Sequence, residues 1–255
     1  MADLASVRRL EAVAFRAWPA VSTQYDGSWL IRLTAGHPSK RVNSVNPLDP
    51  SDTRDIAVRL EKAGKRFSDY GRPLLVRQTP LAPPALIAFM DEAGWSHVGE
   101  TAVMMANLSD TALPESADGV EHLPSRDVGR FVDARIRVSG DDPALKPGLT
   151  EIVSAIKPET GLFIFEEPGF GPSAVSLTVQ DNDLAGVLQL AVAPELRCRG
   201  IGTTIFHSSM RWARLRGAKR AWVQAEVGNE GALALYRNAG FREVYRYIYR
   251  GPAKP

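Results

Sequence analysis

Apolar residues recur with a helical period in some segments of the chain and form short continuous runs in others. Over residues 54–70 the apolar positions Ile56, Leu60 and Phe67 are spaced for one face of a helix. Short apolar runs such as residues 28–33 (SWLIRL) predict strands instead. The same pattern predicts further helices over residues 5–18 and 84–93, and further strands over residues 41–45, 74–77 and 95–107. The first half of the chain therefore mixes helices with strands.

The second half begins a new series of elements after a polar stretch. Residues 109–118 (SDTALPESAD) are typical of a linker. Beyond it the pattern predicts strands over residues 120–123, 162–166, 174–180 and 186–193, helices over residues 126–138, 147–156 and 203–216, and a closing strand, helix and strand. We therefore predict a mixed α/β (α+β) fold with domains over residues 1–108 and 119–255, joined by the linker 109–118.

Two segments of the halves share one layout. Residues 71–95 (GRPLLVRQTPLAPPALIAFMDEAGW) and residues 217–241 (GAKRAWVQAEVGNEGALALYRNAGF) each run from a glycine through a strand, a loop and a helix to Ala-Gly-aromatic, 146 residues apart. Chance similarity between two common strand–helix–strand units is the alternative. We favour a true repeat, because the helix before each segment also matches.

Composition excludes several classes of protein. The 255 residues are 44% apolar and 24% charged, which is ordinary for a globular protein, and the net charge of +2 creates no field that would attract nucleic acid or an anionic membrane. The single cysteine, Cys198, excludes an internal disulfide framework and multi-cysteine metal sites. Residues 1–25 show no apolar signal-peptide core, and the most apolar window, residues 101–108, is too short to span a bilayer. We expect a cytoplasmic protein with no nucleic-acid or membrane partner and no metal.

One turn contains more arginine and glycine than a simple connection needs. The stretch PELRCRGIG, residues 194–202, follows a predicted strand and precedes a predicted helix. Glycines at 200 and 202 let an anion approach the unpaired N–H groups of a helix start, and Arg197 and Arg199 add positive charge. When the repeat offset of 146 is applied, this turn corresponds to residues 51–56 (SDTRDI), which contain no glycine. We therefore expect one anion site, in the second half only.

A second motif follows in the segment NEGALALYRNAGF, residues 229–241. Asn229 is a good helix N-cap, and Ala232 and Tyr236 are spaced to share one helix face. Gly240 suits the residue after the helix end. From spacing alone, Tyr236 is most simply a core aromatic residue.

Together these motifs resemble the GNAT superfamily of acyl-CoA-dependent N-acyltransferases. The matching pattern is Val192-x-Pro194, then Arg197-x-x-Gly200-x-Gly202, then Asn229-x-x-Ala232-x-x-x-Tyr236-x-x-x-Gly240-Phe241. The resemblance covers roughly residues 118–250. With the repeat, it implies two tandem GNAT-like domains, each a mostly antiparallel mixed sheet flanked by helices. The first domain would be degenerate and lack the pyrophosphate loop.

The resemblance implies acetyl-CoA as co-substrate and gives each motif a role. The main chain of the loop would wrap the pyrophosphate, the strand before it would hold the pantetheine arm, and Asn229 would contact the same arm. Tyr236 would protonate the departing thiolate, which is chemically reasonable for a phenol with a pKa of about 10. The implied cofactor-binding residues are Leu190, Ala191, Val192, Arg197, Cys198, Arg199, Gly200, Ile201, Gly202, Thr203, Asn229, Ala232 and Tyr236.

One feature of the family is missing. Many members carry a glutamate on the strand before the loop as general base, but here that strand (AGVLQLAV) has only Gln189 as a polar side chain. Glu226 is our first choice of base, with Glu166 or Glu167 as alternatives. Cys198 has no recognisable base partner and is read as a bystander.

We therefore predict an acetyl-CoA-dependent N-acetyltransferase that modifies a primary amine of a small molecule or a protein by direct attack on the thioester. The alternative function is a non-catalytic acyl-CoA-binding or regulatory module. A nucleic-acid-binding function would rest only on Arg211, Arg214, Arg216, Lys219 and Arg220, and is the weakest hypothesis. The sequence leaves open the acceptor amine, the acyl-chain preference, the role of the first half, and whether the protein is a monomer or a homodimer.

Overall fold

The computed structural model describes residues 3–109, 111 and 123–253, which form two compact units. The first unit comprises residues 1–103 and 243–255, and the second comprises residues 104–242. These limits differ from the predicted ranges, because the last strand lies in the first unit and residues 104–107 lie in the second. Apart from Ser109 and Thr111, the linker predicted over residues 109–118 lies outside the described residues, as does the strand predicted over residues 120–123 apart from Leu123.

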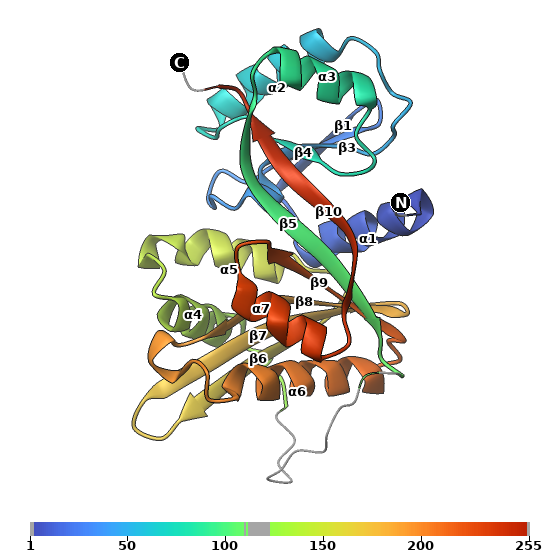
Figure 1. Ribbon diagram of the computed structural model, residues 1–255. Helices are drawn as coiled ribbons and strands as arrows, with labels where there is room; N and C mark the ends of the chain where they lie inside the picture. The colour runs from blue at the N-terminus through green and yellow to red at the C-terminus, as the bar shows by residue number, and fades with distance from the viewer. Residues whose placement is uncertain (1–2, 110, 112–122, 254–255) are drawn as a thin grey trace. The chain divides into compact units, whose positions relative to one another are not determined.

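The first unit is a sheet covered by helices (Figure 1). Its strand order is β1-β2-β3-β4-β10-β5, with β1, β2 and β3 antiparallel, β4 parallel to β3, and β10 antiparallel to β4. Buried apolar residues of β2 and β3 form a core with the helices α2 and α3, which include Leu60, Phe67, Leu86 and Met90. The elements are α1 (Leu4–Ala17), β1 (Ser22–Asp26), β2 (Trp29–Leu33), the 3₁₀ helix η1 (Lys40–Val42), β3 (Ser44–Pro47), α2 (Ile56–Asp69), β4 (Val76–Gln78), α3 (Pro84–Glu92), β5 (Ser96–Asn107) and β10 (Arg242–Gly251).

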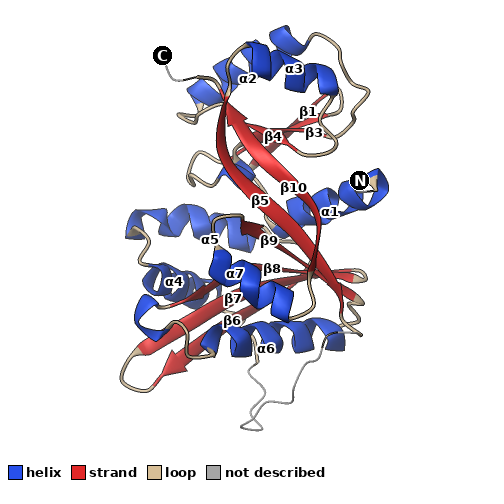
Figure 2. Cartoon of the chain, viewed as in Figure 1, coloured by secondary structure: helices blue, strands red, loops and turns tan. Residues whose placement is uncertain are grey.

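The second unit is likewise a sheet with helices packed against it (Figure 2). Its strand order is β5-β9-β8-β7-β6, in which residues 104–107 of β5 belong to this unit. Strands β6, β7 and β8 are antiparallel, and β9 is parallel to β8. The elements are α4 (Val128–Ser139), η2 (Pro143–Leu145), α5 (Lys146–Ser154), β6 (Glu159–Glu167), β7 (Gly171–Asp181), β8 (Leu184–Val192), η3 (Pro194–Leu196), α6 (Ile201–Leu215), β9 (Arg220–Glu226) and α7 (Glu230–Asn238).

The mixed α/β fold predicted from the pattern is confirmed, and matching backbone details accompany the predicted repeat. Helix α7 begins 146 residues after the start of helix α3 and ends 146 residues after its end. Gly94 and Gly240, which follow these helices, both have positive φ angles of 68° and 84°. Helices α2 and α6 begin 145 residues apart, and each follows a residue in the left-handed region, Asp55 or Gly200. That the first unit is a degenerate copy of the second remains our prediction.

In the first unit, residues 51–56 correspond to residues 197–202 of the second unit, the arginine–glycine turn. Side chains of the first unit interact with one another at residues 51–56. Asp52 accepts hydrogen bonds from the backbone N–H and the hydroxyl of Ser28 at 2.9 and 2.8 Å, and forms an ion pair with Arg59 at 3.2 Å. Burial alone would raise the pKa of Asp52, but these hydrogen bonds and the Arg59 charge lower it well below its usual value. A buried carboxylate at this place is unfavourable for binding a phosphate.

A buried charge pair lies elsewhere in the first unit. Arg77 on β4 and Glu11 on α1 form an ion pair at 2.5 Å, and both side chains are almost completely buried. The hydroxyl of Tyr245 on β10 donates to the same Glu11 oxygen, and the guanidinium of Arg77 lies 3.5 Å from the ring centre of Tyr247. Burial raises the pKa of Tyr245, and the charge of Glu11 adds to this effect. These contacts connect α1, β4 and β10.

Candidate functional site

Strands β8 and β9 of the second unit separate partway along their length. Their parallel pairing runs from Leu184 and Arg220 to Val187 and Val223. Strand β8 nevertheless continues to Val192, and β9 continues to Glu226. On the side of β8 that faces β9, residues 188–192 are therefore without β9 ladder partners among the described residues. A separated parallel pair offers backbone N–H and C=O groups to an extended ligand.

An extra residue in β8 accompanies this separation. Opposite Val175–Leu177 of β7, strand β8 carries the longer stretch Leu188–Ala191, which makes a β-bulge. Gln189 lies in the bulge with a φ angle of +53°, a conformation that few residues other than glycine adopt. The predicted pantetheine-binding residues Leu190, Ala191 and Val192 follow directly and are half-buried. The bulge therefore sets the direction of the strand segment to which the sequence assigns the cofactor.

The arginine–glycine turn is an exposed loop that ends in helix α6. Arg197, Cys198, Arg199 and Gly200 are all exposed. Gly200 is the N-cap residue of α6, with a φ angle of +82°, and no side chain caps the helix. Within the described residues, the first N–H groups of α6 thus have no capping side chain, and the helix dipole is positive at this end. The loop has the chemistry of an anion site.

The two glycines of the loop serve different purposes. Gly200 needs to be glycine because of its left-handed backbone. Gly202 has no such requirement, and a Cβ atom there would lie 3.4 Å from the nearest side chain, Val192, which is an ordinary contact. Internal packing therefore does not explain glycine at 202, whereas close approach of a ligand to the main chain does.

Helix α7 carries Tyr236 into an aromatic cluster. Tyr236 is only 5% exposed, and its ring centre lies 5.3 Å from Phe206 of α6 and 6.1 Å from Phe241. Asn229 is the N-cap residue of α7, and its side-chain oxygen accepts from the N–H of Ala232 at 3.1 Å. The sequence interpretation of Asn229 as a cap is confirmed. The contact between Phe206 and Tyr236 joins the helix of the arginine–glycine turn to the helix of the second motif.

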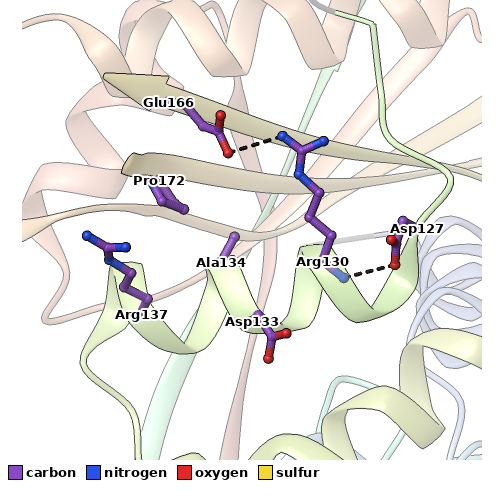
Figure 3. Close-up of a pocket in the computed structure, with 7 residues that line it drawn as sticks. All are labelled: Asp127, Arg130, Asp133, Ala134, Arg137, Glu166 and Pro172. Carbon is purple, nitrogen blue, oxygen red and sulfur yellow. Dashed lines mark hydrogen bonds and ion pairs between the residues drawn. The ribbon is translucent and has the colours of Figure 1, made fainter. Parts of the chain in front are cut away.

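The candidate bases differ in their surroundings. Glu226 is the exposed last residue of β9, and its carbonyl oxygen accepts from the N–H of Asn229 at 2.9 Å. Glu166 on β6 forms an ion pair with Arg130 of α4 at 3.1 Å. Figure 3 shows this pair at one side of a surface hollow of about 400 Å³ that is lined by Asp127, Arg130, Asp133, Ala134, Arg137, Glu166 and Pro172. None of the predicted cofactor-binding residues lines this hollow.

His207 and Arg211 are four residues apart in α6 and therefore lie on one face of this helix. His207 is half-buried, and burial lowers its pKa, with the nearby positive charge of Arg211 adding to the effect. Leu215, the last residue of α6, is 76% exposed.

Sequence reasoning missed a side chain that contacts the bulge. Arg135 of α4 donates from Nε to the side-chain oxygen of Gln189 at 2.8 Å, and from a terminal nitrogen to Asp141 at 2.7 Å. An arginine on a helix gives no sequence signal for such a contact, because the chain separation is 54 residues. Asp141 and its neighbour Asp142 both have partners within the protein: Asp141 forms an ion pair with Arg135, and Asp142 accepts from the N–H of Ala144.

Comparisons with known proteins identify a matching family and a relative of this chain. The family model described as "Probable histone acetyltransferase Rv0428c C-terminal" matches residues 4–250. A relative from Bacillus subtilis (strain 168), "Uncharacterized N-acetyltransferase YobR", is 25% identical over 250 residues, which cover 96% of this chain and 98% of the relative. Among the described residues, no helix is long and apolar enough to cross a membrane.

Solved structures share the fold at low identity. A GCN5-related N-acetyltransferase from Kribbella flavida has a TM-score of 0.71 at 18% identity. The match covers 100% of this chain and 97% of that protein's chain. A second is named "Tandem GNAT protein from the clavulanic acid biosynthesis pathway (without AcCoA)". It has a TM-score of 0.61 at 12% identity, and the match covers 96% of this chain and 89% of that protein's chain. These likenesses concern the fold over nearly the whole chain.

Proposed function

The chain belongs to the acetyltransferase family described as "Probable histone acetyltransferase Rv0428c C-terminal" and is an N-acetyltransferase of the GNAT type; from this premise we propose that it transfers an acetyl group from acetyl-CoA to a primary amine. The amine belongs to a small molecule or a protein. The observation that carries the proposal is the start of α6, where no side chain among the described residues caps the first N–H groups and two glycines and two arginines lie beside them.

Acetyl-CoA fits the residues that are present. Residues 197–203 bind the pyrophosphate through main-chain N–H groups, with Arg197 and Arg199 adding charge. Leu190, Ala191 and Val192 bind the pantetheine arm where β8 has left β9, and Asn229 contacts the same arm through its side-chain amide group. Ala232 faces the arm from the same side of α7 as Tyr236.

The proposed reaction needs no covalent enzyme intermediate. The amine nitrogen attacks the thioester carbonyl carbon, the C–N bond forms, and negative charge develops on the carbonyl oxygen, to which the N–H of Val192 donates. The C–S bond then breaks, and Tyr236 donates its phenolic proton to the thiolate of CoA. The proton lost from the amine passes to Glu226, directly or through water. Glu226 then releases this proton to solvent, and Tyr236 regains a proton from solvent, which restores both groups.

Calorimetric titration with acetyl-CoA tests the pyrophosphate site. We expect Gly202→Glu to weaken acetyl-CoA binding by about a hundredfold or more, because a carboxylate is placed among the groups that bind phosphate. The helix start itself favours a negative side chain, so the melting temperature should be kept. Gly64→Glu on α2 is the matched control, since it introduces the same charge on a helix of the first unit and should leave binding unchanged. Absence of acetyl-CoA binding by the unaltered protein would refute the proposal.

The alternative function is a non-catalytic acyl-CoA-binding module. Both functions predict binding, and they differ in whether CoA thiol is released. Incubation with acetyl-CoA and a panel of amines, followed by thiol detection, separates them. Release that requires an amine and is lost in Tyr236→Phe supports catalysis, whereas binding without release from any amine supports the module.

A further inference from the structure

Arg135 joins helix α4 to the bulge of strand β8. Its Nε donates to the side-chain oxygen of Gln189 at 2.8 Å, and a terminal nitrogen donates to Asp141 at 2.7 Å and also to Ser139. Only 18% of the Arg135 side chain is exposed. A guanidinium held on two sides in this way has little freedom to rotate, and its hydrogen bond to Gln189 is charge-assisted. The contact therefore restrains Gln189 firmly.

The restrained residue is the one with the unusual backbone. Gln189 has a φ angle of +53°, which is unfavourable for a residue with a side chain. Without a compensating interaction, this position would favour an extended conformation, and the extra residue of the bulge would shift elsewhere. The hydrogen bond from Arg135 supplies such an interaction from a helix that packs against β7 and β8.

We propose that Arg135 is a positioning residue that holds Gln189 in its left-handed conformation and thereby directs the N–H of Val192, which faces away from β7, toward the thioester of acetyl-CoA. The inference rests on the proposed function, because that function assigns this N–H to the carbonyl oxygen. Arg135 acts only through Gln189 and touches neither substrate.

Substitution of Arg135 tests the contact. In Arg135→Met we expect acetyl-CoA to bind about tenfold more weakly in calorimetry, with a further loss in kcat, since a hydrogen bond to a charged group is removed. Arg137→Met is the matched control, because Arg137 lies on the same helix and donates instead to the carbonyl of Phe170. It should leave both quantities unchanged.

A double-mutant cycle separates positioning from direct contact or general loss of structure. Glycine adopts positive φ without help, so Gln189→Gly should keep near-normal acetyl-CoA binding. In that background, Arg135→Met should change the Kd for acetyl-CoA less than twofold, because there is no side chain left to hold. An equal loss in both backgrounds would overturn the proposal. If Arg135→Met does not fold, Gln189→Val provides a second test, since a β-branched residue resists positive φ and should weaken binding while Arg135 is intact.

The outcomes also distinguish this inference from the proposed function. If the unaltered protein binds no acetyl-CoA, the proposed function fails and this inference fails with it. If the unaltered protein binds acetyl-CoA and Arg135→Met binds it equally well, the proposed function stands and the positioning role is wrong.

Discussion

Tyr236 illustrates how a single residue can have both a structural and a chemical role. Its ring packs against Phe206 and Phe241, which agrees with the core position that spacing alone indicated. The family resemblance adds a proton-donor role for the hydroxyl, which no packing argument could supply. Because the two roles belong to different atoms of the side chain, one substitution separates them.

We expect Tyr236→Phe to lower kcat by about 10²–10⁴-fold, the usual contribution of a positioned acid. The Kd for acetyl-CoA and the melting temperature should change little, because phenylalanine keeps the ring contacts. Steady-state kinetics with thiol detection, calorimetry and thermal denaturation measure the three quantities. Unchanged turnover would assign the proton donor to water.

Helix α6 shows what the sequence allowed at the scale of an element. The apolar period and the glycines before it predicted this helix, which runs over residues 201–215. Strand β1 was missed, because STQYD has no apolar alternation and forms an edge of its sheet with mostly exposed side chains. The bulge in β8 was also missed, since no residue preference announces a glutamine with positive φ.

A prediction about the pH dependence of stability concerns His207 of helix α6. The pKa of His207 is lowered on folding, so the unfolded chain binds more protons than the folded one once the pH falls below about 6.5. The contribution of His207 to stability is complete above that pH and is lost as the pH falls through the folded pKa. We expect the melting temperature of His207→Gln to fall less than that of the unaltered protein between about pH 7.5 and pH 5.5. An identical fall in both would contradict the assignment.

At the scale of the whole molecule, the first unit is built from two separated parts of the chain, residues 1–103 and 243–255, whereas the second unit is the continuous segment 104–242. The sequence pattern predicted two halves and a repeat between them, but it could not predict which unit each last strand joins. Pattern identifies a strand, whereas pairing depends on contacts between distant residues. Strand β10 pairs with β4 in the first unit, and residues 104–107 of β5 lie in the second. The buried pair Glu11–Arg77 was equally hidden, because a glutamate in a helical pattern is normally solvated.

Because the last strand lies in the first unit and residues 104–107 lie in the second, we expect that the domain proposed from sequence, residues 119–255, does not fold on its own. Expressed alone, residues 109–255 would lack the β5 segment of the second unit and would carry β10 without β4. We expect this fragment to be insoluble or to bind no acetyl-CoA. Co-expression with residues 1–108 should restore a soluble complex that binds acetyl-CoA, as measured by co-purification and calorimetry. A fragment 109–255 that binds acetyl-CoA as tightly as the full chain would show that the second half is autonomous.

The position of β10 also orders events during protein synthesis. This strand lies between β4 and β5 in the sheet of the first unit, yet the ribosome adds it only after the whole of the second unit, residues 104–242. The nascent first unit therefore emerges with the edge of β4 open, and that edge stays exposed until β10 has been made. A stop codon just before β10 would thus damage the part of the protein that was made first.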